Sequence, residues 1–450
     1  MSPVLHMAQV RQVIMIIEDR IEANVTIWQE RINRLIKEHG DYIISNVTVA
    51  QICSGIRGVP IQISDISYVD PGSGLRYRSY TINEVLNLLP KIEGTRYPMT
   101  GGIYYLLMGN EIPTYAKAMS VEEEWKKRAK VPQYVYDVID AFPETASAMS
   151  MFSAAILSMS SQSKFYQAYA NGMSKDQYWH VMLDDSLDLT ARAPRIAAYI
   201  YNKKYRNNQQ IPADENLDLA ANFAHMLGND DPNYAELMRL FMLIHMDHEN
   251  ANVSAHTAHL VGSALSDIYL SCSAGLNGLS GPLHGLANQE CCNWLWGLYH
   301  AYNGVPSTDQ IREYVEKTLA EGRVIPGYGH AVLRCIDPRF TAQMNFAKKN
   351  LPDDELFRTA MNVFEVVPEI LKAKGKVSNP WPNVDAITGT LQNHYGIKET
   401  DFYTVLFGTS RIMGFTAHVV WARALGKPIE RPKALTTRHL ESMISESSFR

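Results

Sequence analysis

The sequence has few cysteines, no long apolar run and no excess of basic residues, and each shortage excludes a class of protein. Its 450 residues include five cysteines, and none forms a Cys-x-x-Cys pair. A sparse, odd set is typical of reduced intracellular thiols and not of a disulfide scaffold. No window contains the roughly 18 uncharged apolar residues that a membrane helix needs, so we expect no membrane span. The net charge of -5 argues against a nucleic-acid binder, which usually has a basic surface.

Motifs for nucleotide, hydrolase and metal chemistry are also missing. Gly327-Tyr328-Gly329 contains part of a glycine-rich loop without the third glycine, and such a fragment is a weak signal. No Gly-x-Ser-x-Gly elbow occurs, which excludes the usual α/β-hydrolase arrangement. His256 and His259 lack a nearby third ligand, so we expect no metal site.

What the sequence does contain is helical periodicity. Apolar residues recur at three- and four-residue spacing between residues 14 and 36, and Gly40 then predicts a helix end. Pro232 predicts the start of another helix, and residues 356–364 repeat the pattern. The best strand-like stretch is 61–68, followed by a turn signal at 71–74. We therefore expect a largely α-helical protein with one small hairpin. The length suggests about two to four domains, and no low-complexity linker separates them.

Glycine is concentrated between residues 274 and 287, where four glycines follow one another at three- and four-residue intervals. In a helix they would form a stripe without side chains, at a cost of about 0.5–1 kcal/mol each relative to alanine. The run therefore predicts tight helix packing, and we expect in addition a subunit interface beside a ligand pocket lined by backbone. The four glycines are Gly275, Gly278, Gly281 and Gly285.

Four short segments place ionisable residues beside glycine or proline. Loops of this kind are where catalytic groups concentrate, although a single histidine is more often a hydrogen-bonded core residue. The two prolines before Asp385 also forbid a regular helix there. The segments are 246–256, 281–285, 326–339 and 379–385.

Together these segments carry a resemblance to a known family. The chain resembles citrate synthases of the type found in eukaryotic mitochondria, from about residue 30 to about residue 440. The matching stretches are His248-Glu249, Asn252–Thr257, Gly281–Glu290, Pro326–Arg334, Asn379–Ala386, Tyr403–Gly408 and Glu430-Arg431-Pro432.

The resemblance implies an all-α homodimer whose subunits each have two domains, with the active site in the cleft between them. The large domain would comprise residues 1–285 and 397–450, and the small domain residues 286–396. The implied enzyme condenses oxaloacetate with acetyl-CoA in the tricarboxylic acid cycle of the mitochondrial matrix. It needs no metal and no cofactor, because acetyl-CoA is a co-substrate.

The family's functional residues fall on named positions of this sequence. Asp385 matches the proton-abstracting base, His284 the enolate stabiliser and His330 the acid that faces the oxaloacetate carbonyl. Oxaloacetate would be held by His248, Arg339, Arg411 and Arg431, the last reaching across from the second subunit. CoA would be bound by Arg57, Lys175, Val324, Ile325, Pro326, Gly327, Tyr328, Gly329, Arg334 and Lys376.

These assignments make chemical sense. The methyl group of a thioester is a weak acid, so a carboxylate base needs a hydrogen-bond donor that stabilises the developing enolate oxygen. A helix that starts at Gly281-Pro282 would keep His284 neutral through its positive dipole, so that it can act as this donor. Arginine suits the two carboxylates of oxaloacetate because its planar fork makes two parallel hydrogen bonds.

The sequence also departs from the family pattern, and the departures leave alternatives open. Ile387 and Thr388 follow Asp385-Ala386 where the family usually has His and Ser, and Lys175 replaces an arginine. A paralogue with a mainly structural role in a larger mitochondrial assembly, and with weakened CoA binding, is therefore one alternative. A 2-methylcitrate synthase that uses propionyl-CoA is another, because it would share the catalytic residues.

Overall fold

The computed structural model describes residues 3–330, 332–375 and 377–447, and nearly all of its regular structure is helical. The first half contains α1 (Pro3–His39), α2 (Val49–Cys53), β1 (Ser67–Asp70), β2 (Gly74–Tyr77), β3 (Tyr80–Thr81), α3 (Ile82–Leu88), α4 (Thr100–Gly109), α5 (Tyr115–Arg128), α6 (Gln133–Asp140), α7 (Ala148–Ser158), η1 (Met159–Gln162), α8 (Lys164–Ala170), η2 (Lys175–Gln177), α9 (Tyr178–Tyr205) and α10 (Leu219–Met226). The second half contains α11 (Pro232–His245), α12 (Val253–Ser263), α13 (Ile268–Leu279), α14 (Ala287–Ala301), α15 (Thr308–Ala320), α16 (Pro338–Asn350), α17 (Glu355–Lys374), α18 (Asp385–His394), η3 (Thr400–Phe402), α19 (Tyr403–Ala424) and α20 (Thr437–Ser447). Within these residues, no helix is both long and apolar enough to cross a membrane.

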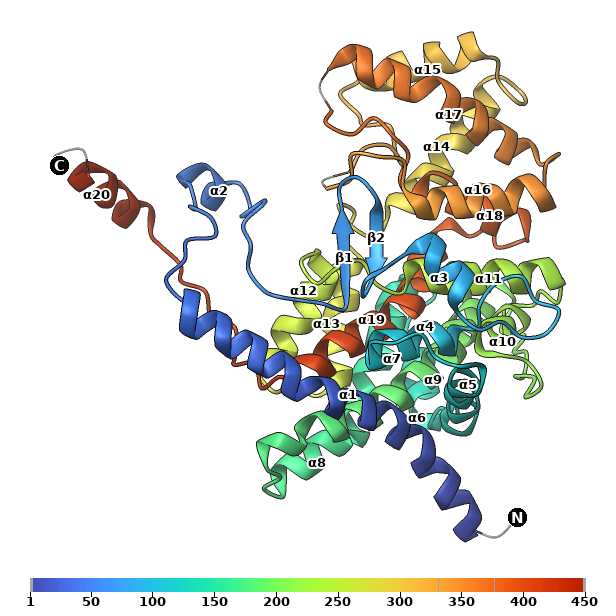
Figure 1. Cartoon of the computed structure of the whole chain (residues 1–450). Helices are drawn as coiled ribbons and strands as arrows, with labels where there is room; N and C mark the ends of the chain where they lie inside the picture. Colours follow the sequence, from blue (N-terminus) through green and yellow to red (C-terminus); the bar gives the residue numbers. More distant parts are fainter. Residues whose placement is uncertain (1–2, 331, 376, 448–450) are drawn as a thin grey trace.

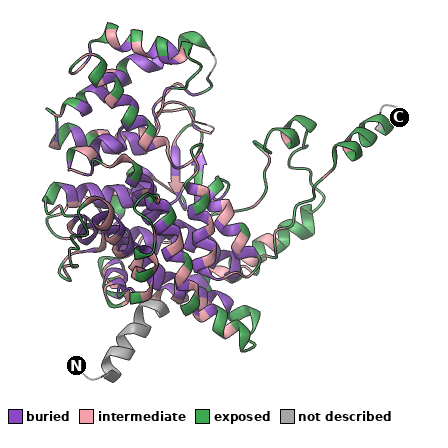
Figure 2. Cartoon of the chain, turned by 180° about the vertical axis from the view of Figure 1, so that it is seen from behind, coloured by how far each residue is buried: buried purple, intermediate pink, exposed green. Residues whose placement is uncertain are grey.

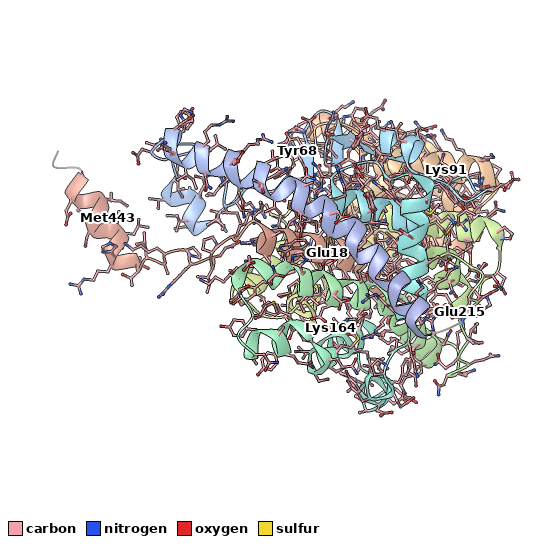
Figure 3. The ribbon with its side chains drawn as sticks, turned by 60° about the horizontal axis from the view of Figure 1, so that its bottom comes forward. Glu18, Tyr68, Lys91, Lys164, Glu215 and Met443 are labelled. Carbon is pink, nitrogen blue, oxygen red and sulfur yellow. The ribbon has the colours of Figure 1, made fainter. Side chains whose placement is uncertain are left out.

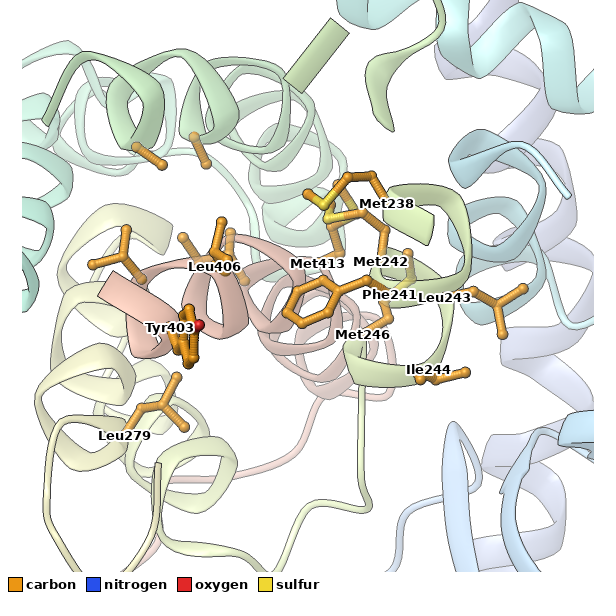
Figure 4. Packing of buried hydrophobic residues seen from close by; sticks show 14 of the residues in the cluster. Met238, Phe241, Met242, Leu243, Ile244, Met246, Leu279, Tyr403, Leu406 and Met413 are labelled. Atoms are coloured by element: carbon orange, nitrogen blue, oxygen red, sulfur yellow. The ribbon is translucent and has the colours of Figure 1, made fainter. Parts of the chain in front are cut away.

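The helices form a large body and a smaller group beside it (Figure 1). The smaller group consists of α14 to α18, which pack on one another. In the body, α19 is buried along nearly its whole length and packs against α4, α7, α9, α11, α12 and α13. Figure 4 shows part of this core, where Met413 of α19 lies near Met238 and Met242 of α11. The two groups meet where α16 contacts α3, α11 and β2, and where α14 contacts α19.

The predicted helix boundaries are largely confirmed. The first helix ends at His39, directly before Gly40, and the helix predicted around residues 356–364 is part of α17. The prediction for Pro232 is also correct, because α11 begins there. Its start is stabilised by Asp231, whose side chain accepts a hydrogen bond from Asn233 N–H.

The strand predicted over 61–68 is wrong for most of that range. The strand β1 begins at Ser67 and pairs antiparallel with β2, with Ser67 opposite Tyr77 and Asp70 opposite Gly74. The predicted turn at 71–74 therefore joins the two strands. Ile61 and Ile63 are 42% and 54% exposed, whereas Ile66 is buried. Residues 61–65, with the apolar Ile61 and Ile63, thus lie outside the sheet because no partner strand extends that far.

Two segments extend away from the body. One runs from the end of α1 through α2, and the other contains α20 (Figures 1 and 3). Both are largely exposed (Figure 2). Their apolar side chains are in contact with water in the single chain; examples are Tyr42, Ile43, Ile44, Met443 and Ile444.

The glycine-rich run packs closely, but it is not one helical stripe. Gly275 and Gly278 lie in α13, which ends at Leu279, whereas Gly281 and Gly285 lie in the turn that follows. A Cβ atom on Gly275 would come within 2.8 Å of the Phe415 ring of α19. A Cβ atom on Gly285 would lie 2.0 Å from the Leu279 carbonyl oxygen. Tight packing is thus confirmed at both positions.

The packing at α13 generates a test with a matched control on the same helix. We expect Gly275→Ala to destabilise the protein by about 1–3 kcal/mol, because the added methyl group would overlap Phe415. Gly278→Ala should be neutral or stabilising by up to about 1 kcal/mol, since its Cβ would make ordinary contacts at 3.4 Å or more. Thermal denaturation at one scan rate measures both. Equal melting temperatures of the two variants would contradict this account of the packing.

Candidate active site

Two buried arginines lie where the smaller group meets the body. Arg339 is in the first turn of α16 and is 3% exposed; its Nε and Nη2 atoms donate to Asp337 at 3.0 and 2.7 Å. Arg411 is on α19 and is 2% exposed; its Nε donates to the His245 carbonyl oxygen at 2.9 Å. Its guanidinium carbon lies 4.5 Å from the centroid of the Phe407 ring. Two guanidinium groups are therefore held at the junction of the two groups of helices.

The charges of these arginines act on the other residues that the sequence predicted for the site. Burial lowers the pKa of Arg411 to about 10, although Asp247 opposes the shift. Arg339 helps to lower the pKa of His248 and of His330, and Arg411 helps to lower that of His248 and of His284. Both arginines also influence the pKa of Asp385. The structure thus brings three histidines and one aspartate, from distant parts of the chain, around two arginines.

His284 lies in the turn between α13 and α14, and its surroundings identify its tautomer. Its Nε2 atom accepts a hydrogen bond from Ser254 N–H at 3.3 Å and lies 2.8 Å from Ser254 Oγ. A backbone N–H can only donate, so Nε2 carries no proton and the neutral ring has its proton on Nδ1. Burial, together with Arg411, lowers the pKa of His284 to about 4. His284 is therefore a neutral ring that can donate from Nδ1.

This geometry corrects the helix assigned to His284. Residues 281–286 form turns, and α14 begins at Ala287, so no helix starts at Gly281-Pro282. The helix terminus that faces the ring is that of α12, because Ser254 is in its first turn. The Ser254 N–H of this turn donates to Nε2 and so favours its unprotonated form. The expected neutral state is present, but its causes are burial and Arg411, and the Ser254 N–H that fixes the tautomer belongs to another helix than the one expected.

His330 has the opposite tautomer. Its Nδ1 atom accepts hydrogen bonds from Val332 N–H and Leu333 N–H, each at 3.0 Å. The proton of the neutral ring is therefore on Nε2. Burial lowers the pKa of His330 to about 4, and Arg339 adds to this effect. A neutral Nε2–H can donate to an oxygen atom of a ligand.

His248 lies beside His330, with the ring centroids 5.4 Å apart. Burial, then Arg339 and His330, hold its pKa well below the usual value. Its Nε2 atom is buried and has no hydrogen-bond partner among the described residues. An orphaned buried nitrogen next to two arginines fits a site that is completed by a polar, anionic ligand.

Asp385 is the first residue of α18, and its backbone N–H donates to Asn383 Oδ1 at 3.0 Å. Burial raises the pKa of its carboxyl group to about 6, with Arg339 and Arg411 opposing the shift. This value keeps the group largely ionised near neutral pH and leaves it more basic than an exposed aspartate. Asp385 can therefore remove a proton from a weak carbon acid if a donor stabilises the product.

Backbone hydrogen bonds bring the loop of His330 next to the loop of Asp385. Gly329 N–H donates to the Trp381 carbonyl at 3.3 Å, and Asn383 N–H donates to the Gly327 carbonyl at 2.9 Å. The Asn383 side chain also donates to the Gly329 carbonyl. Gly327 has φ of +78°, and a Cβ there would lie 2.7 Å from Cα of Ala386. Glycine is required at this position by both the backbone conformation and the close approach.

The predicted CoA-binding residues fall into two sets. Val324 to Gly329 form the loop just described; Val324 is 77% exposed and Ile325 is buried. Arg334 follows in the same group of helices, and its N–H donates to the Pro71 carbonyl at the tip of the hairpin. Lys376 lies outside the described residues. The other set is exposed: Arg57 is on the segment that contains α2, and Lys175 is in η2, directly before α9.

Arg431 also lies away from the other site residues. It is exposed on the segment between α19 and α20, and the structure of the single chain does not bring it to Arg339 and Arg411. The prediction that it serves the site of a second subunit stays a prediction.

Sequence reasoning missed several residues that hold the site together. Ser254 fixes the tautomer of His284, Asp337 binds Arg339 and Asn383 joins two loops. All three lie in the segments where ionisable residues stand beside glycine or proline, but their partners are 2 to 54 residues away in the chain. Their roles become visible only in three dimensions. Within the described part of the chain, no three His, Cys, Asp or Glu side chains form a group that could hold a metal ion.

Comparisons with known sequences agree on one family. The profile described as "Citrate synthase, C-terminal domain" matches residues 55–433. A protein of Glossina morsitans morsitans named "Probable citrate synthase, mitochondrial" is 48% identical over 431 residues, which cover 96% of this chain and 93% of that protein. The "Citrate synthase, mitochondrial" of Daucus carota is 49% identical over 420 residues, which cover 93% of this chain and 89% of its own.

Solved structures show the same fold. The citrate synthase of Pyrobaculum aerophilum superposes with a TM-score of 0.74 at 27% identity, covering 85% of this chain and 91% of its own. A citrate synthase from Thermoplasma acidophilum, solved as a ternary complex with carboxymethyl coenzyme A and oxaloacetate, gives a TM-score of 0.70 at 22% identity; 85% of this chain and 95% of that chain are covered.

The low histidine pKa values predict a pH-dependent contribution to stability. His330 has a pKa of about 4 in the folded protein and an ordinary value of 6.5 when unfolded. Between these values the unfolded chain binds more protons, so this contribution is lost as the pH falls from about 6.5 towards 4. Asp385 acts in the opposite direction because its folded pKa is raised. The test must therefore compare variants.

We expect His330→Gln to lose less stability than the wild type when the pH falls from 7.5 to 5.5, because glutamine has no proton to gain. The melting temperature at both pH values measures this difference. His439→Gln, on the exposed face of α20, is the control and should behave like the wild type. Identical pH responses of His330→Gln and the wild type would show that His330 is not held neutral by the fold.

Proposed function

The chain belongs to the citrate synthase family, and from this premise we propose how its own residues carry out the reaction. It is a mitochondrial enzyme that condenses oxaloacetate with acetyl-CoA to form citrate and CoA in the tricarboxylic acid cycle. We assign each side chain its role from its geometry and its charge.

Oxaloacetate binds between the two groups of helices, against Arg339 and Arg411. The observation that carries this assignment is the burial of two guanidinium groups beside the orphaned Nε2 of His248. A dianion compensates the buried positive charge, and each carboxylate can accept two parallel hydrogen bonds from one guanidinium. His330 Nε2–H donates to the ketone oxygen and polarises the carbonyl carbon. His248 completes the binding site for oxaloacetate.

Carbon–carbon bond formation then needs one base and two donors. The Asp385 carboxylate removes a proton from the methyl group of acetyl-CoA, while His284 Nδ1–H donates to the thioester oxygen and stabilises the enolate. The enolate carbon attacks the ketone carbon of oxaloacetate, and the electron pair of that carbonyl becomes an alkoxide. His330 transfers its Nε2 proton to the alkoxide and regains a proton, through solvent, from the Asp385 carboxyl group, so that the ring is again neutral and Asp385 is again a carboxylate. Water then hydrolyses the thioester of the citryl-CoA that has formed and releases CoA.

The electrostatics of the site suit this division of roles. An Asp385 pKa of about 6 gives a base that is ionised near neutral pH and stronger than an exposed aspartate. The low pKa values of His284 and His330 keep both rings neutral. A neutral ring donates without adding positive charge beside the arginines, and its fixed tautomer aims the proton in one direction. No step requires a metal ion or a redox cofactor, and acetyl-CoA is a co-substrate.

We assign residues 1–285 and 397–450 to a large domain and residues 286–396 to a small one. The packing of α14 to α18 on one another supports this division. The protein is a homodimer in this proposal, and the exposed apolar residues on the segments containing α2 and α20 support an interface with a second copy. Arg431 would then serve the site of the partner, and the exposed Arg57 and Lys175 would bind CoA.

The direct test of the activity is thiol release from acetyl-CoA in the presence of oxaloacetate. We expect turnover with acetyl-CoA and slower turnover with propionyl-CoA. Faster release from propionyl-CoA would instead identify a 2-methylcitrate synthase. A folded protein that releases no thiol from either substrate, and that copurifies in fixed ratio with a large complex, would identify the structural paralogue.

The same assay tests the base. We expect Asp385→Ala to lower kcat by at least about a hundredfold, since general-base catalysis contributes about 10²–10⁴. Asp353→Ala is a suitable control, because Asp353 is an exposed aspartate in the same group of helices. Near-normal turnover of Asp385→Ala would refute the assignment, provided that its melting temperature shows a folded protein.

A further inference from the structure

We propose that Ser67 and His418 are positioning residues for oxaloacetate binding: they hold the carboxylate of Asp247 and so fix the backbone that carries His248. The inference rests on the proposed function of His248. It adds two residues that belong to neither the catalytic nor the substrate-binding set predicted from the sequence.

The Asp247 carboxylate connects three parts of the chain. Asp247 is 0% exposed, and its Oδ2 atom accepts hydrogen bonds from Ser67 Oγ of β1 and from His418 Nε2 of α19, at 2.5 and 2.8 Å. Burial by itself raises the pKa of Asp247, but His418, Arg411 and these hydrogen bonds outweigh it and hold the pKa below its usual value. A buried, ionised carboxylate needs such donors, so losing either one is costly.

Ser67 bridges the residue before His248 and the residue after it. Its hydroxyl donates to Asp247, and the same oxygen accepts from Glu249 N–H at 2.6 Å. Glu249 has φ of +52°, a left-handed conformation that costs a non-glycine residue about 1–3 kcal/mol. A hydrogen bond at that position offsets the cost. The Ser67 hydroxyl therefore fixes the backbone on both sides of His248.

The helix α19 holds the same loop with a second pair of side chains. Arg411 and His418 are seven residues apart, which places them on one face of the helix, two turns from each other. Arg411 binds the His245 carbonyl, and His418 binds Asp247. Between them, a Cβ on Gly414 would lie 2.4 Å from the Met246 carbonyl oxygen, so helix and loop are in direct contact. One helix thus places both the anion-binding Arg411 and the loop of His248.

The hairpin that begins at Ser67 also reaches the other side of the site. At its tip, the Pro71 carbonyl accepts from Arg334 N–H at 2.7 Å. A Cβ on Gly74 would overlap the ring of Pro338, the residue before Arg339. At its end, the Tyr77 hydroxyl donates to the Leu243 carbonyl at 2.7 Å. The hairpin therefore links the loop of His248 to the start of α16, and Ser67 is its anchor on the body.

Removing the Ser67 hydroxyl should weaken oxaloacetate binding more than acetyl-CoA binding. Ser67→Ala leaves Asp247 with one donor fewer and Glu249 N–H without its acceptor. We expect the KM for oxaloacetate to rise about tenfold, in line with the cost of unsatisfied buried polar groups. The KM for acetyl-CoA should change by less than about twofold and kcat by less than about threefold, because no reacting atom is touched.

Two further variants separate positioning from general stability. Ser67→Thr keeps the hydroxyl and should restore most of the oxaloacetate KM. His418→Gln keeps a donor at the end of the side chain and should have a smaller effect than His418→Leu. Ser186→Ala is the matched control, since Ser186 is also a fully buried serine whose hydroxyl bonds a carbonyl, that of Met182 in α9. It should change neither KM.

Steady-state kinetics with each substrate varied, together with melting temperatures, test whether Ser67 and His418 are positioning residues. His248→Ala is measured beside the other variants. If His248→Ala leaves the oxaloacetate KM unchanged, the proposed role of His248 fails. Suppose instead that His248→Ala raises the oxaloacetate KM. The positioning inference is then overturned if Ser67→Ala and His418→Leu leave that KM unchanged, or if they raise the KM values of both substrates equally. It is also overturned if Ser67→Thr does not restore oxaloacetate binding. A selective, hydroxyl-dependent rise supports it.

Discussion

Burying two guanidinium groups near each other is the constraint on which the rest of the site depends. Arg339 has a carboxylate partner in Asp337, but Arg411 makes no ion pair among the described residues. Desolvated positive charge is costly, so neighbouring groups must not add to it. Burial and the arginines together keep His248, His284 and His330 neutral, and neutral histidines have distinct donor and acceptor atoms. The two arginines that we propose bind the dianion thus also add to the burial that keeps these histidines neutral.

Holding these groups in place requires contacts between segments that are far apart in the sequence. The helix α19 carries Arg411 and contacts the loop of His248, while the terminus of α12 faces His284. The loop of His330 is joined to the loop of Asp385 by backbone hydrogen bonds. The site therefore draws on both groups of helices, and a ligand between them would bind to both. Closure around such a ligand would exclude water before the enolate forms.

Much of the fold and the position of the candidate site could be predicted from the sequence, because glycine, proline and histidine occur together in motifs typical of one family. The motifs pointed to Asp385, His284 and His330, which the structure brings around two arginines. Periodicity predicted helices that begin at Pro232 and end before Gly40. The strand predicted over residues 61–68 was wrong for most of that range because alternation cannot show whether a partner strand exists. The helix assigned to His284 was wrong because the terminus that faces it comes from 30 residues earlier in the chain, at Ser254. Tautomers, buried partners such as Asp337 and the left-handed Glu249 depend on packing, which local sequence does not encode.

The central claim is that Arg339 and Arg411 form a preorganised binding site for a dianion. Calorimetric titration with oxaloacetate in the absence of CoA tests this claim most directly. Removing one charged hydrogen-bond donor should weaken binding by about 10- to 100-fold, so Arg411→Gln should bind oxaloacetate at least about tenfold more weakly than the wild type. Arg438→Gln, on the exposed α20, should bind as the wild type does. Binding of oxaloacetate by a folded Arg411→Gln variant with wild-type affinity would contradict the account.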